Sequence, residues 1–95
     1  MYQEALQCEF ENQLIPYVAQ KKIEVFYNDK KLNKFFKADF VCFNKIIVEL
    51  KAIKQINEAT LSQPLNYLKA TKMKLGLLIN FGEKSLTWRR YINTY

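Results

Sequence analysis

The sequence predicts an α/β fold, on the border of α+β, in which two helices flank a mixed sheet. Two observations support this. Apolar residues recur at helical spacing at residues 2–15 and 57–72, whereas the other segments are short and rich in β-branched and aromatic residues. The order is therefore one helix, three strands, a second helix and two strands. A strand that follows the second helix can pair parallel to an earlier strand through a right-handed crossover.

Periodicity marks the first helix and the first strand. Leu6 and Phe10 lie four residues apart on one apolar helical face, and Pro16 ends the helix. Residues 21–28 alternate between apolar and polar side chains, and the Asn-Asp-Lys-Lys segment at their end is typical of a turn.

Residues 34–43 and 45–53 are predicted to form an antiparallel hairpin. Both segments are rich in β-branched and aromatic residues, and a short polar break at Asn44 and Lys45 separates them. A break of this length favours direct pairing of the two strands.

The second helix is predicted over residues 57–72, with Asn57 as its N-cap. Pro64 leaves two alternatives. It either kinks this helix by removing a backbone donor, or it marks a restart of the helix with Ser62 as the new cap.

Two strands complete the chain. Residues 75–81 are almost wholly apolar, which is typical of a strand buried on both faces, and residues 86–92 predict a more exposed last strand. A chain of 95 residues can bury one modest core, so we expect one domain that covers residues 1–95.

Composition narrows the class of function. The net charge of +6 favours contact with a polyanion such as nucleic acid. The chain has no apolar run of the ~20 residues that a membrane span needs and no basic segment followed by an apolar one at its start, so we expect a cytoplasmic protein without membrane contact.

The absence of histidine excludes His-dependent general bases, catalytic triads that contain His, and His-bearing zinc sites. Cys8 and Cys42 lie far apart in sequence and form no C-x-x-C pair. We expect two buried, free thiols in a reducing compartment.

Three charges stand inside the predicted hairpin. Glu49 and Lys51 are two residues apart and therefore share a face of the strand. If the turn is a three-residue loop at residues 43–45, Asp39 lies opposite Glu49 and all three share that face. A two-residue turn would instead place Asp39 opposite Leu50. We predict the three-residue loop.

Two adjacent carboxylates repel each other unless a cation lies between them. Hard oxygen ligands suit Mg²⁺ or Mn²⁺, and a bound water could then attack phosphorus while Lys51 orients that water or stabilises the developing charge. The alternative is a solvated strand face, and spacing alone does not favour either interpretation.

The segments "ADF", "VELKA" and "SQPLNYLKAT" resemble the PD-(D/E)XK nuclease superfamily. More narrowly, "YQEAL", "ELKAI", "QPLNYLKAT" and "KLGLLINFG" resemble the bacterial GxxExxY family of that superfamily. The resemblance covers essentially the whole chain and implies a restriction-endonuclease-like α-β-β-β-α-β core.

The resemblance also implies roles for individual residues. Asp39 and Glu49 match the metal-binding acids, with the Leu50 carbonyl as a further metal ligand, and Lys51 matches the catalytic lysine. Gln63 and Tyr67 resemble the Q-x-x-x-Y motif of RecB-type members. Their four-residue spacing puts both on one helical face if Pro64 does not break the helix.

The N-terminus departs from the family pattern. Tyr2 would be the last residue of the GxxExxY motif, so the glutamate of that motif, a candidate for the helix acid of many such sites, would precede Met1. Glu9 could substitute for it only if the helix is placed differently. Otherwise Glu9 is a solvated acid.

Basic and aromatic residues elsewhere suggest nucleic-acid contacts. Arg89 and Arg90 beside Trp88 fit a patch that contacts phosphates and stacks on bases, or else edge charges that block aggregation. Four further lysines are most simply solubilising, or they widen a basic surface that faces DNA: Lys21, Lys22, Lys30 and Lys31.

Three functions are therefore compared, and the status of the chain as an enzyme is left open. The first is a metal-dependent nuclease-like domain that hydrolyses phosphodiester bonds of nucleic acid, with DNA as the expected substrate. The second is a catalytically inactive relative that binds nucleic acid or a protein. The third is a homodimerising structural module, since a small aromatic-rich domain can need a second copy to cover apolar surface.

Overall fold

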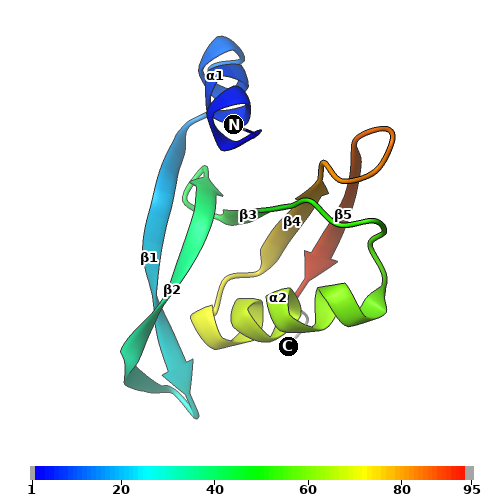
Figure 1. Ribbon diagram of the computed structural model, residues 1–95. Coiled ribbons are helices and arrows are strands. Elements are labelled where there is room, and N and C mark those ends of the chain that lie inside the picture. Colours follow the sequence, from blue (N-terminus) through cyan, green and yellow to red (C-terminus); the bar gives the residue numbers. More distant parts are fainter. Residues whose placement is uncertain (1, 94–95) are drawn as a thin grey trace.

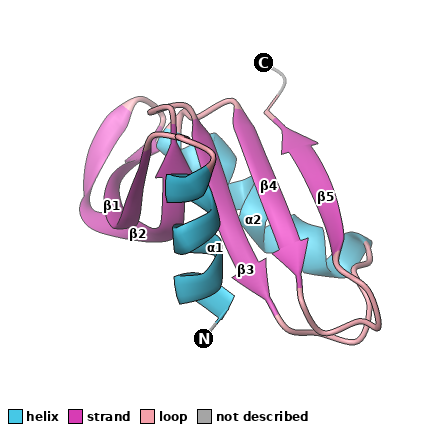
Figure 2. Cartoon of the chain, turned by 90° about the horizontal axis from the view of Figure 1, so that it is seen from above, coloured by secondary structure: helices cyan, strands magenta, loops and turns pink. Residues whose placement is uncertain are grey.

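Two helices lie on opposite faces of a five-stranded sheet in the computed structural model of the chain, which describes residues 2–93 (Figure 2). The elements follow the predicted order, and Figure 1 shows them in chain colours. They are α1 (Tyr2–Asn12), β1 (Tyr17–Tyr27), β2 (Lys30–Cys42), β3 (Ile46–Lys51), α2 (Glu58–Thr71), β4 (Leu75–Asn80) and β5 (Thr87–Ile92).

The strands stand in the order β1-β2-β3-β4-β5. β3 and β4 are parallel, and the other neighbours are antiparallel. The predicted crossover through the second helix is thus confirmed, because α2 connects the only parallel pair among the described strands. The α/β fold with a mixed sheet is confirmed as well, and its order agrees with a restriction-endonuclease-like core.

The first hairpin is longer than the sequence predicted. β1 begins at Tyr17, and β2 begins at Lys30. The turn between them has only two residues, Asn28 and Asp29, with φ values of 50° and 63°. Both residue types tolerate the left-handed region, and two-residue turns of this kind match the twist of paired strands.

α2 is one uninterrupted helix. Asn57 caps it as predicted: its side chain accepts a hydrogen bond from the Thr60 N–H at 3.0 Å, and its own N–H donates to Thr60 Oγ1 at 2.9 Å. The alternative of a restart at Ser62 is wrong. Ser62 lies inside the helix and donates its hydroxyl to the Ala59 carbonyl at 2.9 Å, while Pro64 is buried in the helix interior.

Each face of the sheet has its own core. The α1-side core is built around Phe10, Phe40, Cys42, Val48 and Ile79. The α2-side core is built around Ala38, Val41, Ile47, Ile56, Leu68, Leu78 and Tyr91. Burial of these side chains, at about 25 cal/mol per Å² of apolar surface, is the main force that holds both helices against the sheet.

Gly76 is required by the packing of the α2-side core. A Cβ at this position would lie 2.2 Å from the ring of Tyr91. Tyr91 is the cross-strand partner of Gly76 on β5. Because Gly76 has no side chain, the ring of Tyr91 can lie directly over it.

Both cysteines are free, as predicted, but only Cys42 is buried. Cys8 is exposed on α1, so the expectation of a second buried thiol is wrong. Within residues 2–93, no helix has both the length and the apolar character that crossing a membrane requires.

Candidate functional site

The hairpin of β2 and β3 has the predicted register. Cys42 pairs with Ile46 and Phe40 pairs with Val48, which leaves a three-residue loop at positions 43–45. The same register places Asp39 opposite Glu49. The prediction of the three-residue loop is therefore confirmed.

Asp39 lies where β2 and β3 separate, a point that is here called the fork. The paired region of the two strands ends at Phe40 and Val48. Beyond that point, Asp39 Oδ2 accepts a hydrogen bond from the Leu50 N–H at 2.8 Å. A side-chain carboxylate thus occupies the position of a backbone partner and fixes the distance between the two strands at the fork.

The β1–β2 hairpin changes face at this same point. Phe36 packs with the α2-side core, whereas Phe40 packs in the α1-side core. Residues four apart share a face in a regular strand, so the ribbon must turn over between them. Gln20, with φ 52°, lies in β1 opposite Asp39, between the partners of Ala38 and Phe40. The local irregularity therefore places Asp39 between the two faces of the sheet, as bulges beside functional sites often do.

Glu49 is a buried acid with an unused oxygen. Its Oε1 is shielded from solvent and has no hydrogen-bond partner among the described residues. Burial, then the charge of Asp39 and a hydrogen bond between the two carboxyl groups, together raise the pKa of Glu49 to about 8, although the charge of Lys51 opposes the shift. Unpartnered buried oxygens are costly, so this atom fits a position that a cation would occupy.

Two hollows meet at Lys51. The α2-side hollow, of about 280 Å³, is lined by Phe36, Glu49, Lys51, Thr60, Gln63, Pro64 and Tyr67. The α1-side hollow, of about 310 Å³, is lined by Tyr2, Gln3, Asp39, Leu50, Lys51, Ala52 and Phe81. Lys51 lines both hollows, whereas Glu49 borders only the α2-side hollow and Asp39 only the α1-side hollow.

Gln63 and Tyr67 line the α2-side hollow together with Glu49 and Lys51. Because α2 continues through Pro64, their four-residue spacing puts both side chains on the helix face that borders the α2-side hollow. The ring of Tyr67 stacks on Phe36, with ring centroids 4.5 Å apart. This contact joins α2 to the strand that carries Asp39.

The structure does not bring Glu9 to the fork. Its side chain is exposed on α1, where Glu9 Oε1 accepts a hydrogen bond from Gln13 at 3.1 Å. Tyr2 and Gln3, at the other end of the helix, line the α1-side hollow instead, and Tyr2 stacks on Phe81. Glu9 is about 10 Å along the helix axis from Tyr2, at 1.5 Å per residue.

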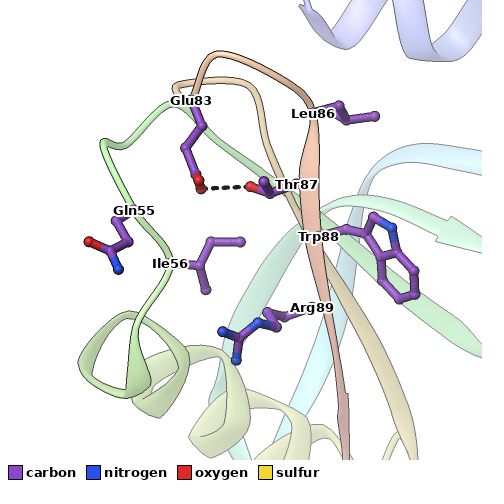
Figure 3. A pocket seen from close by; sticks show the side chains of 7 residues that line it. All are labelled: Gln55, Ile56, Glu83, Leu86, Thr87, Trp88 and Arg89. Atoms are coloured by element: carbon purple, nitrogen blue, oxygen red, sulfur yellow. Dashed lines mark hydrogen bonds between the residues drawn. The ribbon is translucent and has the colours of Figure 1, made fainter.

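Trp88, Arg89 and Arg90 do not form one patch. They are successive residues of β5, so their side chains alternate between the faces of the strand. Figure 3 shows Trp88 and Arg89 on opposite sides of β5. Trp88 is 61% exposed, and all three lie two strands away from β3.

Asn80 is a residue of the site that the sequence did not single out. It is fully buried at the end of β4. Its Oδ1 accepts hydrogen bonds from the N–H groups of Ile53 at 2.9 Å and Gly82 at 3.0 Å. Its Nδ2 donates to the Ile53 carbonyl at 2.9 Å and to Glu83 at 2.7 Å. One side chain thus fixes the segment that follows Lys51. These hydrogen bonds of Asn80 are here called the bracket.

Two neighbours of Asn80 reinforce this bracket. The Phe81 N–H donates to the Lys51 carbonyl at 2.8 Å. Gly82 lies so close to the same segment that a Cβ there would be 2.3 Å from the Ile53 carbonyl oxygen. The end of β4 therefore holds the backbone from Lys51 to Ile53, just before α2 begins. The signal in the sequence is a lone polar residue that closes an apolar strand and is followed two residues later by glycine.

Glu83 completes the bracket inside a third pocket of about 450 Å³. Thr87 Oγ1 donates to Glu83 at 2.6 Å, as Figure 3 shows. Hydrogen bonds from Thr87 and then from Asn80 hold the pKa of Glu83 below its ordinary value. Arg89 borders the same pocket. Glu83 is thus a carboxylate whose hydrogen bonds are supplied by the protein itself.

The oxygen donors at the fork fit a hard divalent cation. Asp39 and Glu49 supply carboxylates, and the Leu50 carbonyl directly follows Glu49 in the sequence. Among residues 2–93 no group of three or more acidic, histidine or cysteine side chains is gathered. A cation held here would therefore keep positions for water and substrate oxygens, which is the usual behaviour of Mg²⁺.

Comparisons with known proteins agree with this architecture. A family model described as the PD-(D/E)XK nuclease superfamily matches residues 1–91. A search of curated protein sequences finds no match. Among solved structures, the crystal structure of SSO0001 is similar, with a TM-score of 0.69 at 14% sequence identity, over 99% of this chain and 50% of that one. This chain thus spans about half the length of that protein, and the likeness concerns the fold alone.

Proposed function

Since the chain belongs to the PD-(D/E)XK nuclease superfamily, we propose that it is a metal-dependent nuclease that hydrolyses phosphodiester bonds of DNA. The observation that carries the proposal is the buried, unpartnered Oε1 of Glu49 beside Asp39. A purely structural acid would be expected to have protein hydrogen-bond partners, as Glu83 Oε2 has in Asn80 and Thr87. The narrower assignment to the bacterial GxxExxY family is part of the same proposal.

Asp39, Glu49 and the Leu50 carbonyl would hold Mg²⁺ or Mn²⁺. When bound, the ion would lower the pKa of a water molecule and neutralise charge on the scissile phosphate. The hydrogen bond from the Leu50 N–H keeps Asp39 Oδ2 at the fork, so that the backbone orients the acid before any ligand arrives.

Lys51 is proposed to act directly on the reacting groups. Its position between the two hollows lets its ammonium group orient the attacking water or stabilise the charge that develops on phosphate. Gln63 is proposed to orient the phosphate or the water from the α2 side, and Tyr67 to support it.

Cleavage assays on plasmid and single-stranded DNA with Mg²⁺ or Mn²⁺ test the proposal. Lys51→Ala should lose cleavage by a factor of 100 or more, since general acid–base and electrostatic groups contribute about 10²–10⁴-fold. Lys54→Ala is the matched control, because Lys54 is an exposed lysine just beyond the site. Absence of cleavage in either metal, or equal cleavage by Lys51→Ala, contradicts the proposal.

The inactive alternative makes a different prediction. A binding module would show salt-sensitive DNA binding without metal dependence and without product. Asp39→Asn and Glu49→Gln would then leave binding intact or strengthen it, since they remove negative charge next to the bound phosphates.

A further inference from the structure

The distal part of the β1–β2 hairpin, residues 21–37, is here called the hairpin arm. Its inner side packs on the α2-side core through Ile23 and Phe36. Toward the tip, packing on the core gives way to contacts with Lys72, which lies 4.6 Å from the ring centroid of Phe26 and pairs with Asp29, and every residue from Lys30 to Phe35 is exposed. Figure 1 shows the tip extending beyond the end of α2. A two-stranded ribbon in water is marginally stable, so the length of the arm calls for a reason other than core formation.

The arm carries positive charge that the protein does not neutralise. Lys22 and Lys37 are direct cross-strand partners. Like charges opposite each other destabilise a sheet, and neither lysine has an acidic partner within ion-pair distance in the described part of the chain. The two acids of the arm are already paired, Glu24 with Lys31 of the arm itself at 3.1 Å and Asp29 with Lys72 at 2.9 Å.

Two aromatic rings stand in solvent among these lysines. Phe35 is 57% exposed and Tyr27 is 68% exposed. Phe35 and Lys37 lie at two-residue spacing on the strand that leads to Asp39. Phe35 is about 13 Å from Asp39 along the strand at ~3.3 Å per residue, the length of roughly four stacked nucleotides. Phe35 and Lys37 thus share the face of β2 that leads to Asp39.

We propose that the outer face of the hairpin arm binds the single-stranded nucleic acid that leads into the fork. Lys22 and Lys37 contact its phosphates, and Phe35 and Tyr27 stack on its bases. Charge complementarity selects a polyanion. Exposed ring faces select an unpaired strand, because the faces of bases inside a duplex are already stacked on one another. The direction of the strand toward the fork rests on the proposed function, whereas binding to the arm does not.

Fluorescence anisotropy with labelled oligothymidine in EDTA tests the arm without any cleavage. The double variant Phe35→Ser, Tyr27→Ser should bind about tenfold more weakly with an unchanged salt dependence. The double variant Lys22→Gln, Lys37→Gln should lower the slope of log affinity against log salt by about 1.4, since each single-strand phosphate contact contributes about 0.7. A duplex of the same length should bind more weakly and should not respond to the aromatic variant.

Matched controls lie at the opposite end of β3. Phe43 is 51% exposed, and Lys45 and Lys74 are exposed as well. Phe43→Ser, and Lys45→Gln with Lys74→Gln, should leave affinity within about twofold. The proposal is overturned if these controls weaken binding as much as the arm variants do, or if duplex binds as tightly as the single strand. Single Phe35→Ser, which changes only an exposed side chain, provides the same readout if a double variant unfolds.

Failure of the arm can be distinguished from failure of the nuclease proposal. If the protein cleaves DNA and the arm variants bind and cleave like the wild type, the arm proposal is wrong and the nuclease proposal stands. If nothing is cleaved in any metal but the arm variants lose binding as expected, the arm proposal stands and the nuclease proposal is wrong.

Discussion

Glu49 and Glu83 are two partly buried carboxyl groups near the carboxyl ends of neighbouring parallel strands, and the protein treats them in opposite ways. Glu83 accepts hydrogen bonds from Thr87 and Asn80, which hold its pKa below the ordinary value. Glu49 keeps an oxygen without a partner in the described structure, and its pKa is raised to about 8. The protein therefore already stabilises the anionic form of Glu83. The anionic form of Glu49 is unfavourable unless a cation is bound beside it.

This contrast indicates different roles for the two acids. Glu83 supports the backbone around the site, whereas Glu49 is available for a ligand. Glu83 and Asn80 hold the backbone that follows Lys51. Glu49 and Asp39 face each other at the fork, where their mutual repulsion can be relieved by a positive ligand. Substitution of each group should therefore affect different measurements.

The largest effect is expected from the pair of variants Glu49→Gln and Glu83→Gln. Glu49→Gln should abolish Mn²⁺ binding in calorimetry and reduce cleavage at least 100-fold, because one of the two proposed carboxylate ligands is lost. Glu83→Gln should leave Mn²⁺ affinity within about threefold, since Glu83 lies in a separate pocket. Equal loss of metal binding in both variants would remove the distinction drawn between the two acids.

Asn80→Ala should produce the largest loss of stability. The substitution leaves two N–H groups and one carbonyl group without the partner that Asn80 supplies, at a cost of roughly 2–4 kcal/mol in the free energy of unfolding. Urea denaturation measures this loss of stability. The control is Lys84→Ala, a substitution at a nearby exposed position that should leave stability unchanged. A cost under about 0.5 kcal/mol would show that the bracket contributes nothing beyond ordinary surface contacts.

The hairpin register and the helix contacts of the site could be predicted because they depend on local chemistry. The polar break near Asn44 and the alternation around Glu49 specify the turn, and four-residue spacing puts Gln63 and Tyr67 on one helix face. These features need only neighbouring residues along the chain.

The remainder depends on contacts between distant segments. Asn80 meets Ile53 across 27 positions of sequence, and a polar residue at the end of a strand is most simply interpreted as solvated. The change of face opposite Gln20 follows from a left-handed backbone in a residue that lies outside the predicted first strand, residues 21–28. Glu9 could serve the site only with a different placement of the helix, and its side chain is exposed on α1 away from the fork.

The two acids should also give opposite pH dependence of stability. The pKa of Glu49 is raised in the folded state, so its contribution is fully present below the unfolded value near 4.5 and is lost as pH rises through about 8. The wild type should lose on the order of 1 kcal/mol relative to Glu49→Gln between pH 5 and pH 9, after allowance for solvent screening. Urea denaturation across this range measures the difference, and a constant difference would contradict the raised pKa.

Thr87→Val should give the smallest effect and the opposite sign with pH. The variant keeps the shape of the side chain but removes the hydroxyl that donates to Glu83. Because the pKa of Glu83 is lowered in the folded state, the stabilisation is present above the unfolded value and is lost as pH falls through the folded one. Thr87→Val should therefore lower Tm by a few degrees at pH 7 and by less at pH 3. Glu49→Gln should depart from the wild type progressively as pH rises from about 4.5 to about 8, so the direction of the pH dependence of each variant identifies which acid is bound by the protein and which is left for a ligand.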